Sequence, residues 1–446
     1  MTEKDMYKSE QQKRIFSITS NFILWIFETL TFAVVWFRYY HNPYNSHFFK
    51  YGHMAVIGLY AIFMYLLTKS FNGYNVSYMR SVDLILSHML AIICSSGAGY
   101  VFICMVFTDY MPVLPVLLGA VIQIVFAGVW IKLTRVIYGR AFPPRKVIII
   151  YGNYPLETFL EKLNTRTDKY EVKEILDYQK GFERICSDVL NFEGVFLYDL
   201  PSGERNGIMK YCYEHDIRTY VVPKITDIIM RGSDYMHLVD TPLFLSRNQG
   251  LHLDQRFVKR MMDIVTALAG IVVTAPLMLI IALFIKVYDG GAALYRQERL
   301  TLGGKRFMML KFRSMGIDAE EQGVQLAKKH DGRITPVGRV LRRLHLDELP
   351  QLFNVLAGDM SIVGPRPERP EIFERYSKEI PDFAIRLKVK AGITGYAQVY
   401  GKYNTKPIDK LKLDLTYIQE YSYWLDIKLM ILTFRVIFRK ESSEGI

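Results

Sequence analysis

The chain has 446 residues and a formal net charge of +12, and half of its residues are hydrophobic. This length is enough for two or three domains. In so apolar a chain, the basic excess favours anionic lipid headgroups and phosphate groups as partners, and no module of basic and stacking residues predicts nucleic-acid binding. The four cysteines form no C-x-x-C pair, so neither a disulfide framework nor a thiolate metal site is predicted.

Four apolar stretches fill the first 140 residues. The first, third and fourth are long enough to cross a bilayer, whereas the second is short. No small-residue cleavage site follows the first stretch, so it is predicted to be an anchor rather than a signal peptide. We therefore expect a transmembrane four-helix region over residues 1–140. The stretches are 16–36, 54–67, 82–107 and 111–131.

Basic residues gather before the first stretch, between the second and third, and after the fourth. The positive-inside rule then places both ends of this region in the cytoplasm. Glu28 lies within the first stretch, where it either pairs with a partner inside the bundle or sits at the membrane interface. The basic groups are Lys4, Lys8, Lys13 and Arg14; Lys69 and Arg80; and Lys132, Arg135, Arg140, Arg145 and Lys146.

The middle of the chain reads as a small parallel α/β domain, which we place at residues 141–250. Pro143 and Pro144 mark its beginning. Only Gly152 follows the first strand, so the glycine pattern of dinucleotide-binding folds is missing. The predicted strands are 146–153, 195–199 and 219–223, and 156–163 is a predicted helix.

A fifth apolar segment, 264–285, carries Pro276 in its middle. It is long enough to cross a bilayer, so a kinked fifth span is one interpretation. Basic residues flank it on both sides, which favours a re-entrant helix that enters and leaves on the same face. These flanking residues are Lys259 and Arg260 before the segment and Lys286, Arg296 and Arg299 after it.

Two adjacent carboxylates, Asp347 and Glu348, precede apolar residues at helical spacing, which predicts that they stand at the beginning of a helix. Asp347 is expected near the N-cap and Pro350 in the first turn, where the missing N–H costs nothing. The pair either stabilises the helix end or carries chemistry.

Soon afterwards, Arg366 lies between Pro365 and Pro367 in a predicted stiff loop. A fixed and always charged fork suits phosphate recognition, so the two segments together indicate phosphoryl chemistry on a diphosphate. The segment 424–440 mixes apolar residues with spaced cations, and it is predicted either to lie on the membrane surface or to form a buried core helix.

Seven motifs in a fixed order make a specific pattern, and on them the chain resembles the bacterial sugar transferases, the polyprenyl-phosphate glycosyl-1-phosphate transferase family. It departs from the family at Ala391, usually proline, and at Leu344-His345, usually Thr-Ser; these changes bear on substrate choice more than on reaction type. The motifs are Lys259-Arg260-Met261-Met262-Asp263, Arg296-Gln297-Glu298-Arg299, Lys311-Phe312-Arg313-Ser314-Met315, Asp331-Gly332-Arg333-Ile334-Thr335-Pro336-Val337-Gly338, Asp347-Glu348, Gly364-Pro365-Arg366-Pro367 and Gly392-Ile393-Thr394-Gly395-Tyr396-Ala397-Gln398-Val399.

The resemblance implies transfer of a sugar-1-phosphate from a UDP-sugar to undecaprenyl phosphate, with release of UMP, as the first membrane step of exopolysaccharide, capsule or O-antigen synthesis. It implies Asp347 as the nucleophile of a phosphosugar–enzyme intermediate, Glu348 as a ligand of Mg²⁺, and Arg366, framed by Pro365 and Pro367, as the diphosphate ligand. Arg313 and Arg333 are weaker candidates for phosphate or carboxylate contacts; for each, a structural salt bridge is the competing interpretation.

The resemblance also implies the architecture of a membrane protein with mixed α and α/β structure. It comprises an N-terminal four-helix transmembrane bundle, a Rossmann-like accessory domain at 141–250, and a mostly helical catalytic domain at 251–446. A re-entrant helix at about 260–288, broken at Ala275-Pro276, would keep the catalytic domain on the cytoplasmic face of the bacterial inner membrane.

Two other classes of protein compete with this interpretation. A nucleotide-sugar epimerase or dehydratase needs a glycine fingerprint and a Tyr-x-x-x-Lys pair on one helix face, whereas Tyr220 and Lys224 flank a predicted strand end. A non-catalytic scaffold predicts loss of the carboxylates or of the arginine loop, and neither is lost. The sugar, the polysaccharide pathway, the role of the middle domain and the oligomeric state, including a homo-oligomer, stay open.

Overall fold

The computed structural model describes residues 3–41, 51–76, 79–246, 250–316, 332–401 and 405–437. Asp331 of the fourth motif and the end of the segment 424–440 lie outside these residues. The chain divides into two compact units, Met1–Val222 and Pro223–Ile446. The predicted mixture of helical and α/β structure, with long apolar helices near the N-terminus, is confirmed. The three-domain division at residues 140 and 250 stays a prediction.

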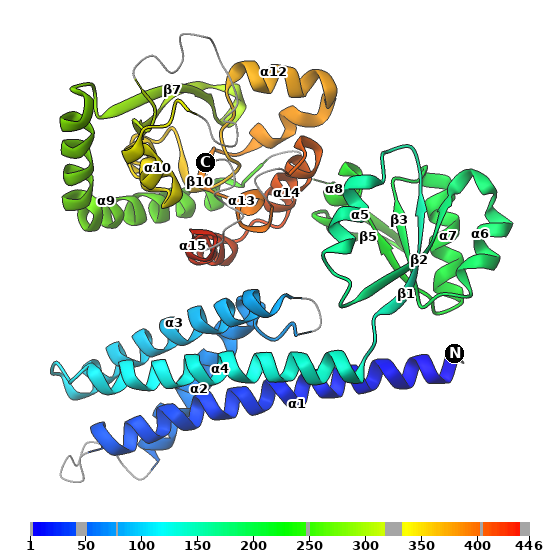
Figure 1. Ribbon diagram of the computed structural model, residues 1–446, viewed down its shortest axis with the longest axis horizontal. Helices are drawn as coiled ribbons and strands as arrows, with labels where there is room; N and C mark the ends of the chain where they lie inside the picture. Colours follow the sequence, from blue (N-terminus) through cyan, green and yellow to red (C-terminus); the bar gives the residue numbers. More distant parts are fainter. Residues whose placement is uncertain are drawn as a thin grey trace. The chain divides into compact units, whose positions relative to one another are not determined.

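Long helices make up the first part of the N-terminal unit (Figure 1). Helix α1 packs against α2 and α4, and α3 packs against α2 and α4. Their outward residues are large and apolar, while the buried ones include small residues that allow close helix contact. The bounds are α1 (Glu3–Val35), continued by the π-helical turn η1 (Trp36–Tyr40), α2 (Gly52–Ser70), α3 (Ser81–Phe107) and α4 (Leu114–Ala141).

Glu28 is completely buried among these helices. Its Oε1 lies 3.0 Å from Nδ1 of His88 on α3, and Nε2 of Gln123 on α4 donates to the Glu28 carbonyl at 2.7 Å. Of the two interpretations of Glu28, pairing inside the helices is therefore the correct one.

A parallel four-stranded sheet of order β2-β1-β3-β4 follows. Helices α6 and α7 cover one face and α5 the other, so successive residues of β1 enter two different cores. This explains the continuous apolar run of that strand. Strand β2 was not predicted, although its largely alternating apolar and charged residues are typical of a half-exposed edge strand. The bounds are β1 (Arg145–Tyr151), α5 (Glu157–Asn164), β2 (Tyr170–Asp177), η2 (Tyr178–Lys180), α6 (Phe182–Val189), β3 (Gly194–Tyr198), α7 (Ser202–Glu214) and β4 (Arg218–Val221).

The C-terminal unit is mostly helical, with three two-stranded sheets among its described residues. Antiparallel pairs are formed by β5 with β6 and by β7 with β8, whereas β9 and β10 are parallel. The bounds are α8 (Ile225–Arg231), β5 (Asp234–Leu238), β6 (Thr241–Leu245), α9 (Leu253–Asp289), β7 (Leu294–Leu300), η3 (Leu302–Gly304), β8 (Arg306–Phe312), α10 (Pro336–Arg343), η4 (Leu346–Glu348), α11 (Gln351–Ala357), β9 (Ser361–Val363), α12 (Pro370–Glu379), η5 (Pro381–Lys388), β10 (Gly392–Thr394), α13 (Tyr396–Tyr400), α14 (Pro407–Gln419) and α15 (Tyr423–Ile437).

Helix α9 is drawn in Figure 1 as two arms that meet at a sharp bend. It runs as one helix from Leu253 to Asp289 with Pro276 inside, which removes one backbone hydrogen bond, so the expected break is a kink within one helix. Met278 and Ile281, beyond the proline, share a core cluster with Phe312 of β8 and Leu341 of α10. The helix is therefore packed against the same domain on which the carboxylates lie.

Three polar side chains fasten the first arm of α9. Nζ of Lys259 lies 2.6 Å from Asp426 of α15, and Arg260 donates to the carbonyls at the end of α11. Asp263 accepts from the Ser361 hydroxyl and the Ile362 amide, both at 2.9 Å. The Lys-Arg-x-x-Asp motif thus anchors the helix to the domain.

Helix α15 buries the face that carries Asp426, Leu429 and Leu432 and leaves Trp424 partly exposed. This favours the core-helix interpretation for the described part of the segment 424–440. Five helices, the fifth being Leu253–Tyr288, are long and apolar enough to cross a membrane. The protein is therefore membrane-bound.

Candidate active site

Asp347 and Glu348 lie in the 3₁₀ turn η4 between α10 and α11. The sequence placed them at the start of the following helix itself, but α11 begins only at Gln351, with Pro350 as its N-cap. Leu349, before Pro350, keeps helical φ and ψ, so the difference lies in hydrogen bonding: Pro350 has no N–H to donate, and the amides of Glu348 and Leu349 bond to carbonyls three residues earlier. His345 precedes the turn in the left-handed region, with φ of 53°. The carboxylates therefore sit on a tight turn whose two ends are both constrained.

Glu348 is paired with two cations. Nη2 of Arg366 donates to its Oε1 at 2.5 Å and Nη1 to its Oε2 at 3.4 Å, so the arginine fork spans both oxygens. Nζ of Lys311, near the end of β8, lies 3.6 Å from Oε1. The Glu348 side chain is 14% exposed, which leaves little water to compete with these contacts.

The pKa values of the two neighbouring carboxyl groups move in opposite directions. Burial raises the pKa of Asp347, and the charge of Glu348 raises it further, whereas the charges of Lys311 and Arg342 lower it by less. Burial also acts to raise the pKa of Glu348, but Arg366 and Lys311 outweigh it and lower the pKa below the usual range. Such divergence within a pair is typical of groups with different chemical roles. The cations therefore favour the charged form of Glu348, whereas burial favours the protonated form of Asp347.

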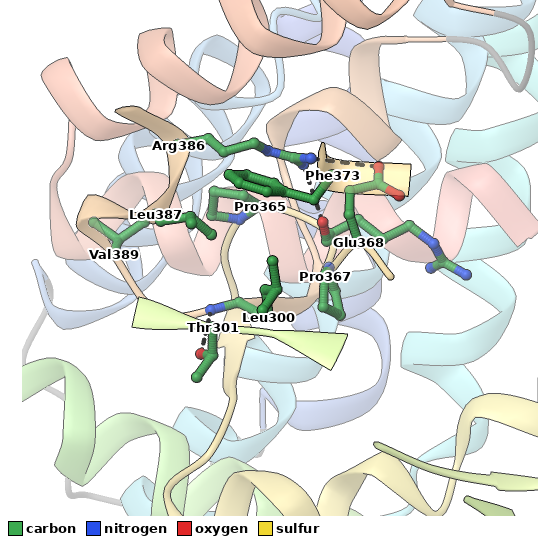
Figure 2. Close-up of a pocket in the computed structure, with 11 residues that line it drawn as sticks. Leu300, Thr301, Pro365, Pro367, Glu368, Phe373, Arg386, Leu387 and Val389 are labelled. Carbon is green, nitrogen blue, oxygen red and sulfur yellow. Dashed lines mark hydrogen bonds and ion pairs between the residues drawn. The ribbon is translucent and has the colours of Figure 1, made fainter. Parts of the chain in front are cut away.

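The loop with Arg366 is held by backbone contacts on both sides. The Gly364 amide donates to Thr394 at 2.8 Å and the Gly392 amide to Pro365 at 2.9 Å, so the loop is tied to β10. A side chain at Gly364 would place its Cβ 2.4 Å from the Lys390 carbonyl, which only glycine avoids. Nη1 of Arg299 donates to the Pro367 carbonyl at 3.0 Å. Figure 2 shows Pro365 and Pro367 in this loop.

Arg313 and Arg333 are not among the charged groups that act most strongly on the carboxylates. The Arg313 amide donates to the Ala293 carbonyl, and a side chain at Gly291 would place its Cβ 2.1 Å from Nη1 of Arg313, so the guanidinium rests against Gly291 in the segment before β7. The Arg333 carbonyl accepts from the Gly316 amide at 3.0 Å. The structure therefore brings together Asp347, Glu348 and Arg366 of the predicted site, whereas the contacts of Arg313 and Arg333 with a substrate stay predictions.

Lys311 and Arg299 are the cations that sequence reasoning missed. Burial lowers the pKa of Lys311 to about 8, while Glu348 acts in the opposite direction. Burial lowers the pKa of Arg299 to about 10, and the nearby Arg366 lowers it further. Both residues stand in the ordered motifs, and Lys311 lies between the apolar Leu310 and Phe312 on β8. A charged residue that breaks an apolar strand pattern is the signal that could have found Lys311.

Asp347 and Glu348 are the carboxylates that could bind Mg²⁺. Among the residues that the structure describes, no three histidine, cysteine or carboxylate side chains gather as a metal cluster. Mg²⁺ commonly uses one or two carboxylates and completes its coordination with water and substrate phosphates. Glu348 with Asp347 beside it provides this minimal set of hard oxygen ligands, so the residues fit an ion shared with a bound diphosphate.

The residues required by the competing enzyme class are separated. Tyr220 lies on β4, where its ring stacks on Phe196 at 4.5 Å and its hydroxyl accepts from Arg145 at 3.1 Å. Lys224 is the N-cap of α8. The two side chains share no helix face, so the Tyr-x-x-x-Lys arrangement of an epimerase or dehydratase is not formed.

The fold and the site define a membrane-bound protein in which buried carboxylates face the cations Lys311 and Arg366. The sequence pattern of the bacterial sugar transferase family matches residues 254–440. An Aeromonas hydrophila protein named UDP-N-acetylgalactosamine-undecaprenyl-phosphate N-acetylgalactosaminephosphotransferase is 34% identical over 61% of this chain and 67% of its own length. The chain belongs to the bacterial sugar transferase family.

Two further relatives are named UDP-glucose:undecaprenyl-phosphate glucose-1-phosphate transferase. The protein of Xanthomonas campestris pv. campestris is 40% identical over 52% of this chain and 51% of its own length. The protein of Escherichia coli K12 is 42% identical over 46% of this chain and 43% of its own length. The matched segments thus span between 43% and 67% of the three relatives.

Proposed function

We propose that the protein transfers a sugar-1-phosphate from a UDP-sugar to undecaprenyl phosphate and releases UMP. The observation that carries this proposal is the buried Asp347 beside a Glu348 that is held by Arg366 and Lys311. Two anionic phosphates must approach each other in such a transfer, and clustered cations offset their repulsion. The printed names of the three relatives describe the same class of transfer.

Asp347 is the proposed nucleophile. Its carboxylate oxygen attacks the phosphorus that bears the sugar, an O–P bond forms, and the P–O bond to UMP breaks. An oxygen of the lipid phosphate then attacks the same phosphorus and releases the carboxylate. The acyl phosphate formed between these steps is reactive enough for the second transfer. The raised pKa of Asp347 favours its nucleophilicity once it is ionised.

Glu348, with the substrate phosphates, would hold Mg²⁺, which supplies charge neutralisation to the diphosphate when bound. Arg366 is the proposed diphosphate ligand, because its fork matches two phosphate oxygens. In the structure this fork contacts both carboxylate oxygens of Glu348. Substrate binding then requires Arg366 to donate hydrogen bonds to the diphosphate, either in addition to those to Glu348 or in place of them.

The proposed topology keeps the carboxylates on the cytoplasmic side, where UDP-sugars occur. Four apolar helices precede the catalytic part, and the kinked α9 carries basic residues on both flanks. A re-entrant α9 in the inner membrane satisfies both features, because its bend lets both ends return to one face. We assign residues 1–140, 141–250 and 251–446 as the transmembrane, accessory and catalytic domains. Such a protein performs the first membrane step of a polysaccharide pathway.

The test is UMP release by the purified protein with undecaprenyl phosphate, Mg²⁺ and a panel of UDP-sugars. One sugar should support release that EDTA abolishes. Asp347→Asn should be inactive, because an amide oxygen cannot form the acyl phosphate, while its melting temperature stays near that of the parent. Near-normal turnover in Asp347→Asn would refute the covalent route, and no release with any sugar would refute the proposed activity.

A further inference from the structure

Arg386 is a buried cation behind the loop that carries Arg366. It lies in η5 (Pro381–Lys388), twenty residues after Arg366, and its side chain is 3% exposed. Figure 2 shows its guanidinium directed at Glu368. Neither the carboxylates nor the proposed substrate contacts use this residue.

The guanidinium of Arg386 reaches two residues of the loop at once. Nη2 donates to the backbone carbonyl of Arg366 at 3.0 Å, and Nη1 donates to Oε1 of Glu368 at 3.3 Å. Together these two contacts restrain the loop at Arg366 and two residues beyond it. They act on the backbone from which the Arg366 side chain extends towards Glu348.

Arg386 is itself fixed from behind. Asp414 of α14 is 1% exposed and lies 2.7 Å from Nη2 of Arg386, and the guanidinium stands 5.0 Å from the ring centroid of Phe383. A buried arginine without a counterion is strongly destabilising, so Asp414 and Glu368 keep the charge in place. Helix α14 therefore serves as the support from which Arg386 holds the loop.

A hollow beside the loop is lined by Pro365, Pro367, Phe373 and Arg386. Pro365 and Pro367 are themselves buried, so the hydrogen bonds from Arg386 add a directional restraint to the packing of the loop.

We propose that Arg386, supported by Asp414, is a positioning residue for Arg366: it holds the loop backbone so that the Arg366 fork meets Glu348 and the substrate diphosphate. This deepens the proposed function and rests on it. Loss of this restraint should lower the rate of transfer, because a misplaced Arg366 would weaken both of its hydrogen bonds to the diphosphate.

The test is Arg386→Lys, which keeps a charge but cannot donate to both loop residues in the same geometry. We expect UMP release to fall on the order of tenfold, and hydrogen exchange of the segment 361–369 to become faster. In the Arg366→Lys background, where no directional fork remains, Arg386→Lys should lower the rate of UMP release by about twofold or less. Arg375→Lys, an exposed change on α12, is the matched control and should change neither rate nor exchange.

Equal losses of rate in both backgrounds would overturn the proposal, because Arg386 would then act independently of Arg366. Unchanged exchange in the segment 361–369 would also overturn it. Hydrogen exchange needs no substrate, so it tests the positioning even if no UDP-sugar is turned over. If Arg386→Lys does not fold, Glu368→Ala removes one loop contact while leaving the Arg386–Asp414 pair, and the same two outcomes decide.

Discussion

The ion pair between Lys259 and Asp426 is predicted to be the main polar anchor of α9. The two side chains are 7% and 4% exposed and stand 2.6 Å apart, and Asp426 also accepts from the Tyr417 hydroxyl at 2.8 Å. Asp426→Asn leaves a buried ammonium without its counterion, which typically costs about 3–5 kcal/mol. Asp263 is also a carboxylate near this pair and compensates part of the charge, so the lower end, about 3 kcal/mol, is expected.

Such a loss should be measurable as a fall in melting temperature of the detergent-solubilised protein. A change of 1 kcal/mol shifts the Tm of a domain of this size by about 2–4 °C, so Asp426→Asn should lower it by roughly 6–12 °C. The matched control is Asp359→Asn, which disturbs a more exposed pair with Lys305 at 3.8 Å and should cost less than about 1 kcal/mol.

The double variant Lys259→Met with Asp426→Leu should recover most of the stability, because apolar side chains of similar size remove the unpaired charge. Equal Tm values for Asp426→Asn and Asp359→Asn would refute the reasoning. The anchor would then depend on apolar packing rather than on the buried pair.

Three other predictions follow from the site, the sheet and the bend. Arg366→Lys should lower kcat/KM for UMP release about tenfold or more, because the charge stays but the fork is lost; an unchanged value would make Arg366 structural. Burial, with repulsion from Arg166 and Arg135, lowers the pKa of Lys169 to about 7, whereas its usual value is 10.5. Between pH 7 and pH 10.5 the Lys169 amine is protonated more fully in the unfolded chain than in the folded protein, so the free energy of unfolding should rise with pH. Lys169→Met should therefore raise Tm more at pH 7 than at pH 10. An equal rise in Tm at both pH values would contradict this. Pro276→Ala favours a straight α9. Cysteines introduced near Arg296 should be labelled from the cytoplasm in the parent protein, whereas in Pro276→Ala a fraction should be labelled from outside and UMP release should fall. Labelling from outside in the parent protein would mean that α9 is a true fifth span.

Local patterns in the sequence were sufficient for the apolar helices, three strands of the parallel sheet and the family motifs. A helix that crosses a membrane needs a continuous apolar run, so its position can be predicted from neighbouring residues alone. The same holds for β1, whose two buried faces require a continuous apolar strand. Asp347, Glu348 and Arg366 could be singled out because they stand in an ordered set of motifs, and the structure brings Glu348 and Arg366 into contact.

Contacts between distant residues could not be predicted in this way. Lys311 faces Glu348 only because β8 packs beside the turn η4, and Arg386 reaches Arg366 only because η5 folds behind the loop. Lys259 likewise finds its counterion 167 residues away. Nothing in the local pattern marks which acid will pair with which buried base, because burial and proximity depend on the packing of whole elements. The sequence therefore determined the class of chemistry, and only the tertiary structure decided which cations hold Glu348 and the arginine loop in place.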